Sequence, residues 1–136
     1  MSVKNDKALD EAAIRDLVES WAGAVRAKDF DRILAHHSAD ILMFDVPPPL
    51  ASKGIDAYRK TWDPFFAWSD EPVVFEIQDM EIVAGSDVAF VAALMRCAGT
   101  EKSGEKLKLD FRLTIGLRKL GGQWTVVHEH HSVPAD

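Results

Sequence analysis

The chain has one cysteine among its 136 residues, so it can form no disulfide within itself. Cys97 lies in an apolar stretch where a small hydrophobic residue would fit, and no nucleophile motif surrounds it. The sequence also lacks an apolar run of about 18 residues, the length that a membrane-spanning helix needs. Its first residues carry no hydrophobic segment typical of a signal peptide. From these absences we expect a cytoplasmic protein that does not enter membranes.

Basic residues are also in deficit, since 16 Lys and Arg face 22 Asp and Glu for a net charge of −6. Nucleic-acid binding needs cations to neutralise phosphates, so this balance argues against nucleic acid as a partner. The hydrophobic fraction of 47% and the charged fraction of 28% are typical of a globular protein. With no linker, repeat or low-complexity segment, the length predicts a single domain over residues 1–136.

Helical spacing dominates the first half of the chain. An apolar stripe with a spacing of three to four residues predicts a helix from about Asp6 to Lys28, with Leu17 and Trp21 buried. The stripe consists of Leu9, Ala13, Ile14, Leu17, Val18, Trp21 and Val25. Asp29 resembles an N-cap for a short helix from Phe30 to about His37, in which His36 and His37 have a structural role near the C-terminal dipole.

A strand and a third helix follow. Asp40 to Asp45 reads as a short strand that ends at the prolines of residues 47–49, which offer no backbone donors to a sheet. Gly54 precedes a helix from Ile55 to about Trp62, and Pro64 interrupts the pattern.

From Pro72 onward the pattern changes to strands separated by glycine-containing turns. The predicted strands are Val73–Ala84, Val88–Ala98, Lys106–Lys119 and Trp124–Val133. Helices followed by an antiparallel meander predict an α+β fold, in which a curved sheet wraps around the N-terminal helices.

The last strand has an unusual polar face. Alternation places Trp124, Val126, His128, His130 and Ser132 on one side, whereas a core face would hold aliphatic residues. His128 and His130 have three interpretations: acid/base groups of a pocket, metal ligands with Asp45 or Asp110, or members of a buried network. The spacing fixes no third ligand, so we predict no metal. Glu129 and His131 alternate to the other face, where we expect a dimer partner or solvent.

The preceding strand carries a second polar face. Lys108, Asp110, Arg112 and Thr114 alternate with a continuous apolar face. Asp110 and Arg112 are neighbours on that face, so an ion pair between them is one interpretation and a proton-donating Asp110 is the other. Pairing these faces across Gly121-Gly122 predicts one polar patch that contains Arg112, His128 and His130.

The order of elements and several local motifs resemble the nuclear transport factor 2-like superfamily, in its SnoaL-like and ketosteroid isomerase-like branch. The motifs are Asp45-Val46-Pro47-Pro48, Gly54 to Tyr58, Arg112-Leu113-Thr114 and Trp124 to Ser132, and the likeness runs from Leu9 to Pro134. The resemblance implies a cone-shaped α+β barrel, open at one end, with a hydrophobic pocket for a small-molecule ligand, commonly in a homodimer. We expect that homodimer to form through the outer sheet face, where Val127, Glu129 and His131 are predicted to point.

The resemblance also suggests roles for single residues. Asp45 matches the position of the isomerase's general base, while a turn-capping Asp is the alternative. Asp110 falls near the oxyanion-stabilising acid. Trp21 stands where that enzyme has a tyrosine, a departure that argues against steroid isomerisation by the same mechanism, and Trp21 also fits the core stripe.

Aromatic side chains complete the expected pocket. Tyr58 either reaches the pocket mouth or lies on the surface. The aromatic cluster that follows it, Trp62, Phe65, Phe66 and Trp68, either closes the core or forms a wall for a flat ligand. The substrate-binding residues predicted are Trp21, Tyr58, Trp62, Phe66, Arg112 and Trp124, and the catalytic ones are Asp45, His128, His130 and Asp110.

Two functions therefore remain open: a cofactor-independent acid/base enzyme of isomerase or cyclase type acting on a small apolar substrate, and a noncatalytic ligand-binding or dimerisation module. In the first, Asp45, Arg112, His128 and His130 converge on one cavity.

Overall fold

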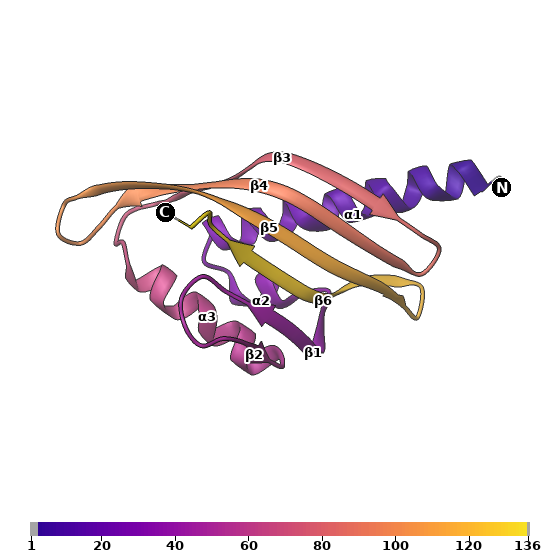
Figure 1. Cartoon of the computed structure of the whole chain (residues 1–136), viewed down its shortest axis with the longest axis horizontal. Helices are drawn as coiled ribbons and strands as arrows, with labels where there is room; N and C mark the ends of the chain where they lie inside the picture. The colour runs from indigo at the N-terminus through magenta and orange to yellow at the C-terminus, as the bar shows by residue number, and fades with distance from the viewer. Residues whose placement is uncertain (1–2, 136) are drawn as a thin grey trace.

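Six strands form one curved sheet, and the helices lie against its inner face (Figure 1). The computed structural model describes residues 3–135. The elements are α1 (Val3–Arg26), α2 (Phe30–Leu34), β1 (His37–Phe44), β2 (Ser52–Lys53), α3 (Ile55–Ala67), β3 (Val74–Ala84), β4 (Val88–Thr100), β5 (Lys106–Leu120) and β6 (Gln123–Ser132). The predicted α+β class with a curved, mainly antiparallel sheet is confirmed. No helix within residues 3–135 is both long and apolar enough to cross a membrane.

The strand order is β2-β1-β6-β5-β4-β3, and only β1 and β6 run parallel to each other. The β5–β6 turn contains Gly121 and Gly122, whose φ angles of 57° and 81° lie in the left-handed region. Two successive positive φ angles match the turn that joins twisted antiparallel strands, and glycine adopts them without strain. The four predicted C-terminal strands are present, and their ends differ from the prediction by at most two residues.

Helix α1 packs its apolar side against β3, close to the prediction. Ile14, Val18 and Trp21 are buried, but Leu17 is only half-buried and Leu9 is 58% exposed. The buried stripe is thus rotated away from the line of Leu9 and Leu17, because the N-terminal turns of α1 extend past the sheet (Figure 1).

Helices α2 and α3 differ in length from the prediction. Helix α2 ends at Leu34, and His36 takes a φ of 59°, so His37 begins β1 instead of ending a helix. Helix α3 continues through Pro64 to Ala67. The missing Pro64 N–H removes one helical hydrogen bond, but Phe65 and Phe66 after it pack against the core, and this contact keeps the last turn helical.

A β-bulge in β6 reverses which side chains face the core. Leu117 pairs with Val126 and Gly116 pairs with His128, so Val127 is an extra residue in β6. Trp124 and Val126 face inward before the bulge, and Glu129 and His131 face inward after it. The predicted side for His128 and His130, and the outward side predicted for Glu129 and His131, are therefore wrong, because an extra residue shifts the alternation by one.

Candidate functional site

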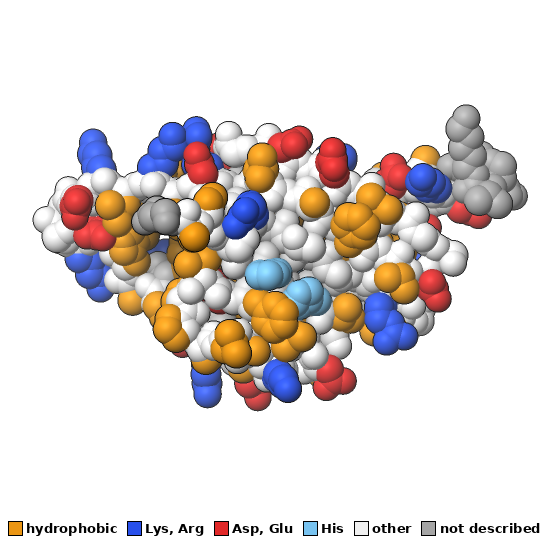
Figure 2. All heavy atoms as spheres, viewed as in Figure 1, with side chains coloured by type: hydrophobic (Ala, Val, Ile, Leu, Met, Phe, Trp, Pro, Cys, Tyr) orange, Lys and Arg blue, Asp and Glu red, His pale blue; other side chains and the backbone are white. Residues whose placement is uncertain are grey.

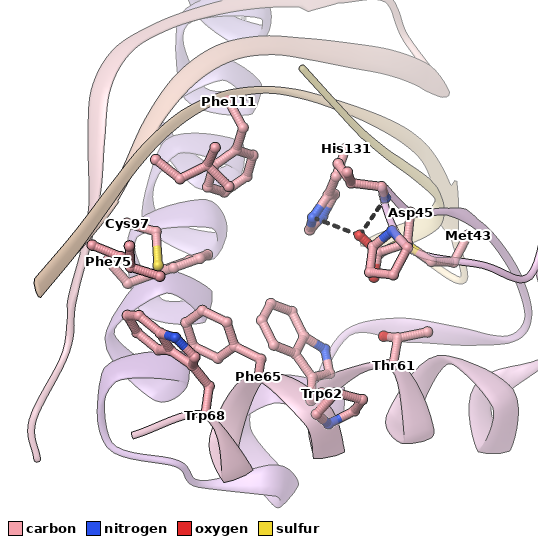
Figure 3. A pocket seen from close by; sticks show the side chains of 15 residues that line it. Met43, Asp45, Thr61, Trp62, Phe65, Trp68, Phe75, Cys97, Phe111 and His131 are labelled. Carbon is pink, nitrogen blue, oxygen red and sulfur yellow. Dashed lines mark hydrogen bonds and ion pairs between the residues drawn. The ribbon is translucent and has the colours of Figure 1, made fainter. Parts of the chain in front are cut away.

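A cavity of about 380 Å³ lies between α3, the end of β1 and the inner face of β3, β4 and β5. Its aromatic lining is Trp62, Phe65, Trp68, Phe75 and Phe111 (Figure 3). Its aliphatic lining includes Met43, Val46, Pro47, Leu107 and Leu109. Such a wall excludes water from most of the surface of a small ligand, and it suits a molecule with an apolar body.

Asp45 and His131 are the two charged or imidazole side chains of this lining. Asp45 follows β1, and His131 reaches the same place from β6, the strand that pairs with β1. Their Oδ1 and Nδ1 atoms are 3.8 Å apart, with side chains 20% and 8% exposed (Figure 3). The Asp45 Oδ1 also accepts a hydrogen bond of 2.8 Å from the Val46 backbone N–H. The cavity therefore has one polar end.

Glu129 lies behind His131 and is fully buried. Its Oε1 accepts hydrogen bonds from the Tyr58 hydroxyl at 2.8 Å and from His37 Nε2 at 3.0 Å. Its Oε2 faces His131 Nε2 at 3.3 Å. The Tyr58 hydroxyl in turn accepts the indole N–H of Trp21 at 3.1 Å. These five side chains, from α1, β1, α3 and β6, form what we call the Glu129 network.

Electrostatics fix the charge of this network. Burial alone would raise the pKa of Glu129, but the hydrogen bonds and charges of His131 and His37 lower it to about 2. Burial, and then the charge of Glu129, raise the pKa of Tyr58 well above its usual 10.0. At neutral pH Glu129 is therefore a carboxylate that only accepts hydrogen bonds, and Tyr58 is a neutral donor.

The hydrogen-bonding roles of the two histidines follow from their partners. His37 Nδ1 faces the Ala35 carbonyl at 2.8 Å, while its Nε2 faces Glu129, so both nitrogens meet acceptors. A neutral imidazole donates to one of these acceptors, and an imidazolium donates to both. His131 donates through Nε2 to Glu129, which leaves Nδ1 toward Asp45 and the cavity. Nδ1 accepts a proton when His131 is neutral and donates one when it is charged.

The residues predicted to share the polar patch lie on the outer face of the sheet, away from the cavity. His128 and His130 pack edge-on against Phe44, and Arg112 donates to Ser132. Asp110 is ion-paired at 2.9 Å, but its partner is Arg96 on β4, where we expected Arg112. The bond from Arg96 lowers the pKa of Asp110, so Asp110 is ionised at neutral pH.

The predicted convergence of Asp45 with Arg112, His128 and His130 is therefore wrong. The residues are nevertheless neighbours on the outer face, because Arg112 lies opposite Ser132 and Thr114 lies opposite His130 where β5 pairs with β6. The bulge at Val127 places its histidines outside.

Among the predicted substrate-binding aromatics, only Trp62 lines the cavity. Trp21 and Tyr58 are buried and belong to the Glu129 network. Phe66 stacks on Trp62 from behind, with ring centroids 5.9 Å apart. Trp124 lies away from the cavity, where its indole N–H donates to Asp10 at 3.1 Å.

The functional residues that the sequence analysis placed wrongly are His37, Glu129 and His131. A glutamate between two histidines, in a strand that also holds Trp124, Val126 and Val127, signals a buried charge that needs partners. Either alternation of the strand would bury polar groups, and the sequence does not show where a bulge falls. Within residues 3–135, no group of three or more His, Cys, Asp or Glu side chains is arranged to hold a metal ion.

Comparisons with known proteins give a consistent result. The family model of the SnoaL-like domain matches residues 14–136. An NTF2-like protein of unknown function from Pseudomonas putida KT2440 is 37% identical, with 95% of this chain and 89% of that chain covered and a TM-score of 0.85. A comparison with curated proteins gave no match.

Two more distant structures share the fold. A ketosteroid isomerase-like protein from Erwinia carotovora atroseptica SCRI1043 is 21% identical, with 90% and 96% of the two chains covered and a TM-score of 0.75. The association domain of CaMKII from C. elegans is 19% identical, with 95% and 99% covered and a TM-score of 0.75.

Proposed function

This chain belongs to the SnoaL-like domain family of the nuclear transport factor 2-like superfamily, and we propose that it is a cofactor-independent acid/base enzyme of isomerase or cyclase type, acting on a small apolar substrate. The observation that carries the proposal is the pair of Asp45 and His131 at the polar end of an apolar cavity, 3.8 Å apart. Titratable groups in a cleft, backed by a buried charge partner, are typical of sites that transfer protons.

Each residue of the pair has a role in this reaction. Asp45 takes a proton from the substrate, because it is the carboxylate of the cavity lining and stands at its polar end. Charged His131 donates its Nδ1 proton to the substrate atom on which negative charge develops. The pair then returns to its starting state when Asp45 releases its proton to solvent and His131 takes one up from solvent. Glu129 fixes His131 by accepting its Nε2–H, and is a positioning residue.

Exchange of protons with solvent tests the proposal without knowledge of the natural substrate. We expect the protein to accelerate the exchange of the acidic C–H protons of 2-tetralone, a small bicyclic ketone, for deuterium in D₂O, followed by NMR. Asp45→Asn and His131→Asn each remove one proton-transfer group, so each should lower the acceleration at least about 100-fold. Binding of the neutral ketone should persist in Asp45→Asn.

Asp40→Asn and His36→Asn are the matched controls, since both positions are exposed and lie outside the cavity lining. They should keep the rate of the unmodified protein. Exchange no faster than buffer, or a rate unaffected by Asp45→Asn and His131→Asn, would contradict the proposal and favour the noncatalytic ligand-binding module.

We also propose that the protein is a homodimer formed through the outer face of the sheet. The helices cover the inner face only, and apolar side chains of β3 and β4 stand exposed outside: Val83, Val88, Phe90 and Leu94. Figure 2 looks onto this face and shows orange side chains around the histidines. An exposed apolar sheet face favours association with a second copy. The expected cytoplasmic location stays a prediction.

A further inference from the structure

The lining of the cavity contains acceptors and aromatic faces, but it offers few donors. No Lys or Arg belongs to the described lining. The Thr61 hydroxyl donates to the Tyr58 carbonyl at 2.6 Å, and the Trp68 indole N–H donates to Glu101 at 3.3 Å. The indole N–H of Trp62 has no hydrogen-bond partner among the described residues, but its nitrogen is buried in the wall and is not exposed to the cavity. A ligand that brings acceptors therefore meets few partners apart from His131.

Asp45 needs a donor that the protein does not supply. Among the residues that the structure describes, the hydrogen bond to its carboxylate comes from the Val46 backbone N–H and occupies Oδ1. His131 Nδ1 is 3.8 Å from that same oxygen, beyond hydrogen-bond distance. Four-fifths of the Asp45 side chain is withdrawn from solvent, since it is 20% exposed. A carboxylate so placed, with Oδ2 unpartnered, is stabilised most by a charged donor.

Aromatic rings surround the space next to this carboxylate. Trp62 and Phe111 come from α3 and β5, and both rings lie within 6.2 Å of the His131 ring, measured between centroids. Phe65 and Phe75 continue the wall from Trp62 at centroid distances of 5.8 and 6.0 Å (Figure 3). The faces of aromatic rings attract cations, and the attraction grows when water is excluded.

From these observations we propose that the ligand of this cavity is an amine with an apolar ring body, whose ammonium group binds Asp45 Oδ2 among the aromatic rings. The inference rests on the proposed function, because it names the substrate class for the same pocket. It places an N–H proton of the ligand at the carboxylate that we propose as the base. An anionic ligand of the same shape would meet the Asp45 carboxylate and the negative ring faces, so it should bind worst.

Three compounds with one ring system separate the possibilities: 2-(2-naphthyl)ethylamine, 2-(2-naphthyl)ethanol and 2-naphthylacetate, measured by isothermal titration calorimetry near pH 7. We expect the amine to bind at least about 10-fold more tightly than the alcohol, and the carboxylate to bind most weakly. Asp45→Asn should reduce the affinity for the amine to that for the alcohol. It should leave the affinity for the alcohol unchanged, which also shows that the variant is folded.

Asp40→Asn, the matched control, should keep the preference for the amine. The inference is overturned if the carboxylate binds as well as the amine, if Asp45→Asn keeps the preference, or if the amine does not bind at about 1 mM. The results that would refute this inference differ from those that would refute the proposed function. Exchange of ketone protons without an amine preference refutes only the ligand class, whereas an amine preference without exchange refutes only the enzyme.

Discussion

At the scale of single residues, Glu129 is the carboxylate that lies fully buried in the described core. Its carboxylate is fully buried and meets three side-chain donors, from Tyr58, His37 and His131. Glu129→Gln keeps the shape but removes the negative charge and replaces one acceptor oxygen with an amide NH₂ that faces buried donors. Donors left unpaired inside a buried network are costly, so we expect urea unfolding at pH 7 to show a loss of about 3 kcal/mol.

The same residue predicts how stability depends on pH. Folding lowers the pKa of Glu129 from 4.5 to about 2, so its contribution is complete above the unfolded value and is lost as pH falls from 4.5 toward 2. The difference in unfolding free energy between the unmodified protein and Glu129→Gln should therefore shrink at pH 3. Glu105→Gln, at an exposed position, should show no such difference. A difference equal at pH 7 and pH 3 would contradict this account.

At the scale of elements, the β6 bulge decides which residues form the site. Deleting Val127 would make Val126 and His128 adjacent and restore regular pairing with β5, in which Trp124, Val126, Glu129 and His131 all still face inward. We therefore expect thermal unfolding to show a stability close to that of the unmodified protein. Deleting His130, where the pairing with β5 is regular, would put Glu129 and His131 on opposite faces, so this variant should lose much of its stability or fail to fold. Equal losses in the two deletions would contradict the assignment of Val127 as the extra residue.

The helices and strands also show which parts of the fold could be predicted from the sequence alone. The strands β3 to β6 and the inner stripe of α1 were predictable, because alternation and helical spacing report burial directly. Asp45 was predictable from its place at the end of a strand, through the family resemblance. The inward side of β6 was not, because Trp124 to His131 alternate equally well in either sense and no glycine or proline marks the bulge.

The side-chain pairs that form between strands could not be predicted from the sequence either. The ion pair of Asp110 with Arg96 depends on the register of β4 and β5, and the bond of His37 with Glu129 joins residues 92 positions apart. Neither register nor such a long-range contact can be read from local spacing.

At the scale of the whole molecule, the helices bury one face of the sheet and leave the other face uncovered (Figure 1). Phe90 is 47% exposed on the outer face of β4 and pairs with Val83 on β3, which is 50% exposed. A stable dimer needs about 800 Å² from each partner, and these exposed apolar side chains supply its apolar centre. We expect sedimentation velocity at micromolar concentration to show a species of twice the chain mass of 15.1 kDa.

Phe90→Lys places a charge at the centre of the proposed interface, where two copies of the ammonium group would be desolvated together, so we expect this variant to sediment at the mass of one chain. The side chain is half exposed, so the fold should tolerate the change, which far-UV circular dichroism checks. Leu50→Lys is the matched control, because Leu50 is 96% exposed in the loop after β1 and away from this face. A single-chain mass for the unmodified protein would refute the dimer, and a dimer that survives Phe90→Lys would move its interface to another surface.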